Sequence, residues 1–230
     1  MSYDDCLTTD GILEVLNDEI SARQGKMLET LQHRGSLFAR SLLPDLEEIR
    51  VRDRVQSGVA LRATQSAVWV YPYVFRLVCR NGAIIARAAE GREISELDAL
   101  PAHEAETLLR EAIAASAEKQ SFANTAEQMR SAAQRPFDLV LTMMPMLARL
   151  SSINSQLARQ VLDHFVRDHD KTQYGLMNVV TALARDTRDA DLRWKLEEFG
   201  GELALQDSPE HELSKRYEQE LPQTSRVAVS

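Results

Sequence analysis

The spacing of apolar residues changes twice along the chain and divides it into three regions. Apolar residues recur at helical intervals between Ile12 and Ile20, and we expect a helical segment over residues 1–44. Over residues 45–92 apolar and polar residues alternate, which is the period of a β-strand. The helical spacing returns over residues 101–200.

The middle region predicts four short antiparallel strands. Arg50, Arg52 and Arg54 alternate with less basic neighbours, which would place all three arginines on one side of a single strand. A longer strand is predicted over residues 68–80. It is followed by Asn81-Gly82, a dipeptide typical of tight hairpin turns, after which the chain would return as the next strand.

The C-terminal half predicts a series of helices. Residues 102–134 lack glycine and proline and favour one long helix, although the phase of its apolar positions slips near residues 116–120. A helix near residue 153 would be capped by Ser151 or Ser152. Further helices are expected over residues 136–150, 173–185 and 190–199, the last ending at a Gly200-Gly201 cap.

These elements predict an α+β protein. A small antiparallel sheet (about residues 45–92) would pack against long helices that follow it (about residues 101–200). The expected organisation is an N-terminal helical segment at residues 1–44, an α+β core domain at residues 45–205, and a polar, mobile tail at residues 206–230.

The composition is that of a globular protein, with 44% hydrophobic and 27% charged residues. No apolar run is long enough to cross a bilayer, and the N-terminus does not match a signal peptide. Cys6 and Cys79 are the only cysteines, which does not suggest a disulfide framework. We therefore expect a cytoplasmic protein that does not associate with membranes.

Positive charge is concentrated in the middle region of a chain whose net charge is −8. Residues 50–92 contain eight arginines against Asp53 and Glu90, so this segment carries +6 and the rest of the chain −14. The same segment is rich in aromatic residues, and single-stranded nucleic acids are bound by cationic grooves with aromatic stacking platforms. The candidate nucleic-acid-binding residues are Arg50, Arg52, Arg54, Arg76, Arg80, Arg87, Tyr71 and Tyr73.

The same residues have a structural interpretation. Aromatic side chains that alternate along a strand commonly form core, and the arginines could pair with acidic residues of the helices. In the predicted helix over residues 173–185, a polar stripe comprises Tyr174, Asn178, Thr181 and Arg185. We interpret this stripe as a solvent face, the alternatives being an interface or a buried polar network.

Other chemistry-bearing residues do not form a recognisable site. Residues 163–170 contain two histidines and three aspartates, but His164 and His169 lack the four-residue step of a zinc-binding pair. His33 is isolated along the sequence. Phosphate-loop, dinucleotide and nucleophile-elbow motifs are absent, so we expect no metal, no cofactor and no enzymatic activity.

Two blocks of sequence resemble a known family. Residues 67–85 read AVWVYPYVFRLVCRNGAII and are similar to an "R-x-V-C-x-N-G" strand and turn, and residues 174–201 are similar to a later "N-x-x-T" helix and its glycine-ended partner. In this order the blocks resemble phage- and plasmid-borne proteins known as domain of unknown function 932. The resemblance implies a mobile-element context and no established chemistry.

The hypothesis that combines these observations is non-catalytic, sequence-independent binding of single-stranded nucleic acid, in recombination or replication, by a protein that forms homo-oligomers. An alternative is an acidic helical module that binds a protein partner such as a host or defence factor. The least favoured alternative is a metal-dependent nuclease that uses residues 163–170.

Overall fold

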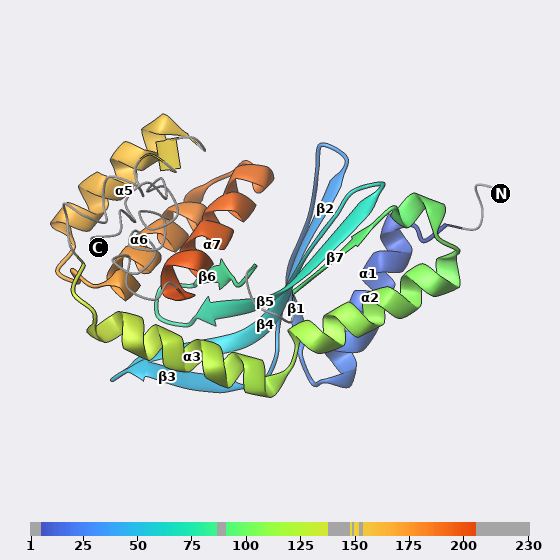
Figure 1. Ribbon diagram of the computed structural model, residues 1–230, viewed down its shortest axis with the longest axis horizontal. Helices are drawn as coiled ribbons and strands as arrows, with labels where there is room; N and C mark the ends of the chain where they lie inside the picture. The colour runs from blue at the N-terminus through green and yellow to red at the C-terminus, as the bar shows by residue number, and fades with distance from the viewer. Residues whose placement is uncertain (1–5, 87–90, 138–147, 149, 152–153, 206–230) are drawn as a thin grey trace, which may run out of the picture.

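The computed structural model describes residues 6–86, 91–137, 148, 150–151 and 154–205 (Figure 1). The strands are β1 (Lys26–His33), β2 (Ser36–Leu42), β3 (Leu46–Arg50), β4 (Asp53–Ala63), β5 (Ala67–Arg76), β6 (Asn81–Ile84) and β7 (Arg92–Ser95). The helices are α1 (Thr9–Ala22), the short 3₁₀ helix η2 (Leu97–Ala99), α2 (Ala102–Ser116), α3 (Lys119–Gln134), α5 (Ser155–Arg167), α6 (Gln173–Asp186) and α7 (Ala190–Leu205).

The strands of the described residues form one seven-stranded antiparallel sheet with the order β1-β2-β4-β5-β6, in which β3 also pairs with β4 and β7 with β5. The predicted α+β class is therefore confirmed. Pro72 lies where β5 changes partner from β7 to β6, and its carbonyl accepts a hydrogen bond from the Ile85 amide (2.9 Å). A proline at this junction interrupts neither of the two ladders.

The prediction of helix up to residue 44 is wrong, because the sheet begins at residue 26. Strands β1 and β2 form a hairpin whose register runs from Lys26 opposite Leu42 to His33 opposite Ser36. Arg34 and Gly35 connect them with φ angles of 48° and 77°, the left-handed backbone that two-residue hairpin turns require. The apolar residues of β1 are spaced irregularly, so their pattern did not distinguish strand from helix.

Two predictions for the middle region, a strand over the first arginines and a turn at Asn81-Gly82, also differ from the structure. Residues 49–55 do not form one strand: Arg50 pairs with Asp53 across a hairpin, and Arg52 lies in its turn with φ 65°. Further along, the turn comprises residues 77–80, whereas Gly82 lies within β6. Gly82 is needed there for close packing, since a Cβ atom would lie 2.1 Å from the Tyr73 hydroxyl.

Three hydrophobic clusters flank the sheet. Helices α1 and α2 cover one part of it and share a cluster with Val59 and Leu61 of β4. Helices α3, α5, α6 and α7 enclose a second cluster with Val55 and Val74. Helix α7 also contributes Trp194 to a third cluster, so it contacts the sheet through two of the cores.

The helical half follows the prediction in outline and departs from it at the ends of helices. The predicted long helix over residues 102–134 is two helices, α2 and α3, and they separate where the apolar phase slips. Helix α5 is capped by Asn154, whose side chain accepts two backbone amide hydrogen bonds, and not by Ser151 or Ser152. Most of the helix predicted over residues 136–150 lies outside the described residues.

Helix α7 continues through Gly200 and Gly201 to Leu205, so the predicted glycine cap is wrong. These glycines allow close contact: a Cβ atom on Gly201 would lie 2.0 Å from the Ile84 carbonyl oxygen, and one on Gly200 would lie 2.4 Å from Thr181 Cγ2. Among the described helices, none has the length and apolar character needed to cross a membrane.

Candidate functional site

The structure separates the candidate arginines into an inward-facing and an exposed group. Arg76 faces inward and donates hydrogen bonds of 2.7 Å to both carboxylate oxygens of Asp53. The Tyr174 hydroxyl donates a further hydrogen bond to Asp53 (3.2 Å). Although burial alone would lower the pKa of Arg76, the Asp53 carboxylate raises it further above its ordinary value. Arg76 is thus a permanent cation whose charge is neutralised inside the fold.

Arg50 is engaged in the same region. It donates to the Asp170 carboxylate (2.5 Å), the Thr172 hydroxyl (2.9 Å) and the Ala133 carbonyl (2.6 Å). The guanidinium groups of Arg50 and Arg76 both lie against the Tyr174 ring, with their carbons 5.3 and 5.6 Å from its centroid. Such contacts are favourable cation–π pairs. Neither arginine is therefore available to a phosphate without breaking this network.

The polar stripe of α6 is an interface, and our interpretation of it as a solvent face is wrong. Tyr174 and Thr181 are buried. Asn81 donates to the Thr181 hydroxyl (2.5 Å), and Arg185 donates to the Cys79 carbonyl (2.6 Å). The stripe therefore holds α6 on the end of β5 and the start of β6, which brings together the two sequence blocks of the family resemblance.

The candidate aromatic platforms are occupied by internal packing. Tyr73 is 1% exposed, and burial raises the pKa of its hydroxyl well above the ordinary value. Tyr71 is half-buried against Trp194, with ring centroids 6.3 Å apart. A base can stack only on an accessible ring face, so Tyr73 does not provide a platform and Tyr71 provides at most part of one.

Glu197 of α7 binds two further arginines, Arg40 of β2 and Arg193 of α7 itself. Glu197, which is 1% exposed, accepts hydrogen bonds from Arg40 (2.8 Å) and Arg193 (3.1 Å), and both arginines also pair with Glu29 of β1. Burial raises the pKa of Glu197, and the two guanidinium groups oppose that rise. This network was not predicted, because its members belong to β1, β2 and α7 and carry no common sequence pattern.

Three candidate arginines remain exposed at one end of the sheet. Arg52 lies in the β3–β4 turn, Arg54 at the start of β4 and Arg80 in the β5–β6 turn. The two turns are adjacent, since the Leu77 amide donates to the Arg54 carbonyl (3.0 Å). None of the three side chains has a partner within the described residues. Arg87 lies outside these residues.

Apolar side chains accompany the three arginines. Val51 is 87% exposed and Val78 60% exposed, and both belong to the same two turns, as does the partly exposed Leu77. We call the six residues the sheet-end surface: Val51, Arg52, Arg54, Leu77, Val78 and Arg80. One acid, Glu48, lies opposite Arg54 on β3 and accepts a hydrogen bond from the Arg52 amide (3.0 Å). The surface is therefore basic and partly apolar.

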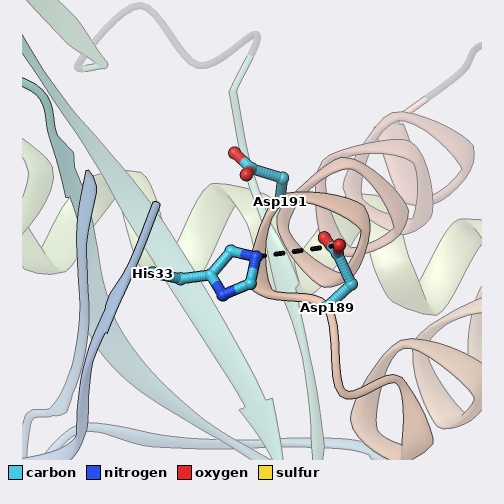
Figure 2. Close-up of side chains that lie close together, drawn as sticks. All are labelled: His33, Asp189 and Asp191. Atoms are coloured by element: carbon cyan, nitrogen blue, oxygen red, sulfur yellow. Dashed lines mark ion pairs between the residues drawn. The ribbon is translucent and has the colours of Figure 1, made fainter. Parts of the chain in front are cut away.

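A second cluster of chemistry-bearing residues lies where the β1–β2 hairpin approaches the start of α7. Figure 2 shows the His33 imidazole facing Asp189, with the Asp191 carboxylate beside them. One ligand atom from each of the three residues lies within 4.8 Å of the other two. His33 Nε2 is 3.7 Å from Asp189 Oδ2, beyond hydrogen-bonding distance, and this buried nitrogen has no hydrogen-bond partner.

The acid–histidine segment at residues 163–170 shows no comparable arrangement. In the part of the chain that the structure describes, three metal-ligating groups come within 4.8 Å of one another in the His33 cluster and not in this segment. Asp170 is bound by Arg50 and Thr172, and Asp168 accepts a hydrogen bond from the Asp170 amide (2.9 Å). The residues considered for a nuclease centre are thus not assembled into one.

Comparisons with known proteins identify no relative of this chain. The chain matches no family model, no curated protein sequence and no solved structure. The resemblance to the domain of unknown function 932 therefore stays a prediction.

Proposed function

We propose that the protein binds single-stranded nucleic acid through the sheet-end surface, without catalysis and without sequence specificity. The observation that carries the proposal is the set of three exposed arginines, Arg52, Arg54 and Arg80, which two adjacent turns bring to one end of the sheet. Exposed guanidinium groups without an internal carboxylate partner can bind phosphate oxygens with little reorganisation.

The inward-facing arginines support this surface and do not form part of it. Arg76 holds β5 to β4 through Asp53, and Arg50 holds the end of β3 to the segment before α6. Because the charges of Arg50 and Arg76 are neutralised internally, the unpaired positive charge at this end of the sheet comes from the three exposed arginines, reduced by Glu48, while the nearby Arg185 is paired with Asp186. The proposal therefore retains Arg52, Arg54 and Arg80 from the predicted set.

Exposed aliphatic side chains, and not the predicted tyrosines, are the groups of this surface that could contact bases. Val51 and Val78 project from the turns that carry Arg52 and Arg80. Aliphatic side chains that flank phosphate-binding arginines can pack against exposed base faces, the same contact that apolar wedges make in duplexes only after they unstack a base step. Unpaired bases expose their faces to such contacts, whereas a duplex exposes them only after unstacking. This difference favours single strands over duplexes.

Contacts to phosphates position a nucleic acid but do not read its sequence, so the binding would be sequence-independent. Three arginines supply modest affinity for each copy of the protein. Oligomerisation along a strand would raise the overall affinity by repeating the same surface. A role in recombination or replication of a mobile element fits this mode of binding and rests on the family resemblance alone.

The proposal is tested with a fluorescently labelled single-stranded oligonucleotide of mixed sequence, titrated with the protein at low salt and followed by anisotropy. Substitution of Arg52, Arg54 and Arg80 by glutamine should abolish saturable binding, because it removes the positive charges and retains most of each side chain. The control variant carries glutamine at Arg34, Arg188 and Lys195, which are also exposed. It changes the net charge equally and should bind like the wild type.

Three outcomes contradict the proposal: no binding by the wild type at low salt, equal losses in the two variants, or tighter binding to duplex than to single strands. If the protein instead binds an acidic polypeptide with apolar side chains through Val51 and Val78, the wild type would show no binding to the oligonucleotide at low salt. The acidic-helix version of that alternative has less support, since Glu197 and Asp191 on α7 face arginines of the sheet.

A further inference from the structure

We infer that His33, Asp189 and Asp191 form a binding site for one divalent transition-metal ion, with zinc as the best match. The inference is independent of nucleic-acid binding, because the two turns of the sheet-end surface lie at the opposite end of β4 from the β1–β2 turn. Its basis is the geometry of the three side chains, the unsatisfied nitrogen of His33 and the way neighbouring residues hold each carboxylate.

The separation of His33 and Asp189 suits metal ligation better than hydrogen bonding, and Asp191 lies within 4.8 Å of both. Two ligands of a tetrahedral zinc ion, with bonds of about 2.0–2.1 Å, lie about 3.3 Å apart. His33 Nε2 and Asp189 Oδ2 are 3.7 Å apart, so a shift of a few tenths of an ångström would bring them to that separation. A direct hydrogen bond would require a closer approach, and Nε2 makes none although it is buried.

The neighbouring residues orient both carboxylates through their Oδ1 atoms, and Asp189 Oδ2 lies near His33 and Arg34. Asp189 Oδ1 accepts a hydrogen bond from the Leu192 amide (3.0 Å), and Asp191 Oδ1 pairs with Arg62 (2.8 Å). Arg62 is in turn fixed over the ring of Trp69, 5.3 Å from its centroid. Such outer contacts hold the first ligands of metal sites in place.

The ligand set determines the class of ion. One imidazole nitrogen with two carboxylate oxygens is a borderline donor set that suits zinc and related first-row ions, whereas magnesium and calcium prefer oxygen alone. The two carboxylates oppose the charge of a divalent ion, although Arg62 already neutralises part of the Asp191 charge. Arg34 lies 3.6 Å from Asp189 Oδ2, and because its side chain is 72% exposed it can swing into solvent when an ion binds.

The competing explanation is that these residues only fix the hairpin to α7. In that case Asp189 acts as a helix cap with a histidine and an arginine nearby. The hydrogen bond that Asp189 accepts from the Leu192 amide lowers the pKa of Asp189 more than any other contact, which agrees with a capping role. Capping by Oδ1 and ligation by Oδ2 are compatible, so an experiment must separate them.

The experiment is calorimetric titration of the full chain with zinc chloride. We expect one ion bound per chain, and more than about tenfold weaker binding in each of the variants His33→Ala, Asp191→Asn and Asp189→Asn. Asp189→Asn is informative because asparagine is an equally good helix cap, so folding is preserved while the anionic ligand is lost. His103→Ala on α2 is the matched control, since His103 is exposed, and it should bind zinc like the wild type.

Circular dichroism melts of each variant establish that the comparison is made on folded protein. The inference is overturned if the wild type takes up no zinc, or if His33→Ala and Asp189→Asn bind it as tightly as the wild type. Loss of zinc binding in His169→Ala with retention in His33→Ala would also overturn it and would place the ion at residues 163–170.

Discussion

Arg76 and Asp53 form a two-pronged ion pair, with both nitrogen–oxygen distances 2.7 Å, while Arg80 in the following turn is exposed. The two arginines are four residues apart and were equivalent in the sequence. In the structure one neutralises a buried acid and the other can contact a partner. Substitution of Arg76 should therefore lower the stability of the fold, whereas substitution of Arg80 should not.

Arg76→Ala should lower the free energy of unfolding by about 3 kcal/mol, because it leaves the buried Asp53 carboxylate without its cation. Arg80→Ala should change it by less than about 0.5 kcal/mol, as is usual for exposed positions. Urea denaturation followed by circular dichroism measures both. Equal destabilisation by the two substitutions would show that the Asp53 pair does not stabilise the hairpins as the geometry indicates.

The Asp170 carboxyl should make the stability sensitive to acid. Burial alone would raise its pKa, but hydrogen bonds from Arg50 and Thr172 outweigh this and lower it below the ordinary value. A lowered pKa in the folded state stabilises the protein above the unfolded-state pKa, and this contribution is lost as the pH falls through the folded-state value. Asp170→Asn should be less stable than the wild type at pH 7, and the difference should shrink as the pH falls below about 4. A difference that is constant with pH would contradict this.

Gly201→Ala should destabilise the protein severely. Its Cβ atom would lie 2.0 Å from the Ile84 carbonyl oxygen, so α7 would have to move away from β6. Gly11→Ala is the matched helical control, since its Cβ atom would meet the end of the flexible Leu7 side chain at 3.0 Å and Thr8 Oγ1 at an ordinary contact distance of 3.5 Å, and alanine favours helix over glycine. Thermal melts should show a large fall in Tm for Gly201→Ala and a small or opposite change for Gly11→Ala. Similar melts for both would exclude close α7–β6 packing.

The sequence predicted the fold class and most helices because local periodicity reports these directly. One long helix was predicted over residues 102–134, although the slip in apolar phase near residues 116–120 coincides with the break between α2 and α3, and α6 ends within one residue of its expected bound. The sequence did not predict β1, whose apolar residues do not alternate cleanly, nor the continuation of α7 through Gly200 and Gly201. Those glycines are explained by contacts with Thr181 and Ile84, which no local pattern reveals.

The candidate site was predicted only in part, for the same reason. The excess of arginines over acids located the basic segment at residues 50–92. Strand alternation alone could not show that Arg50 and Arg54 lie on opposite sides of a hairpin turn. Whether an arginine is free depends on distant acids, such as Asp170 for Arg50. The approach of His33 to Asp189 likewise arises from the packing of the first hairpin against α7. Long-range contacts of this kind leave no spacing signal in the sequence.

The most direct test of the central claim is the salt dependence of single-stranded oligonucleotide binding. Each phosphate neutralised on a single strand contributes about −0.7 to the slope of log affinity against log salt concentration, so three arginines predict a slope of about −2. Arg80→Gln should make the slope shallower by about 0.7, whereas Lys195→Gln should leave it unchanged. A wild-type slope near zero, or one that Arg52→Gln, Arg54→Gln and Arg80→Gln leave unaltered, would contradict nucleic-acid binding by the sheet-end surface.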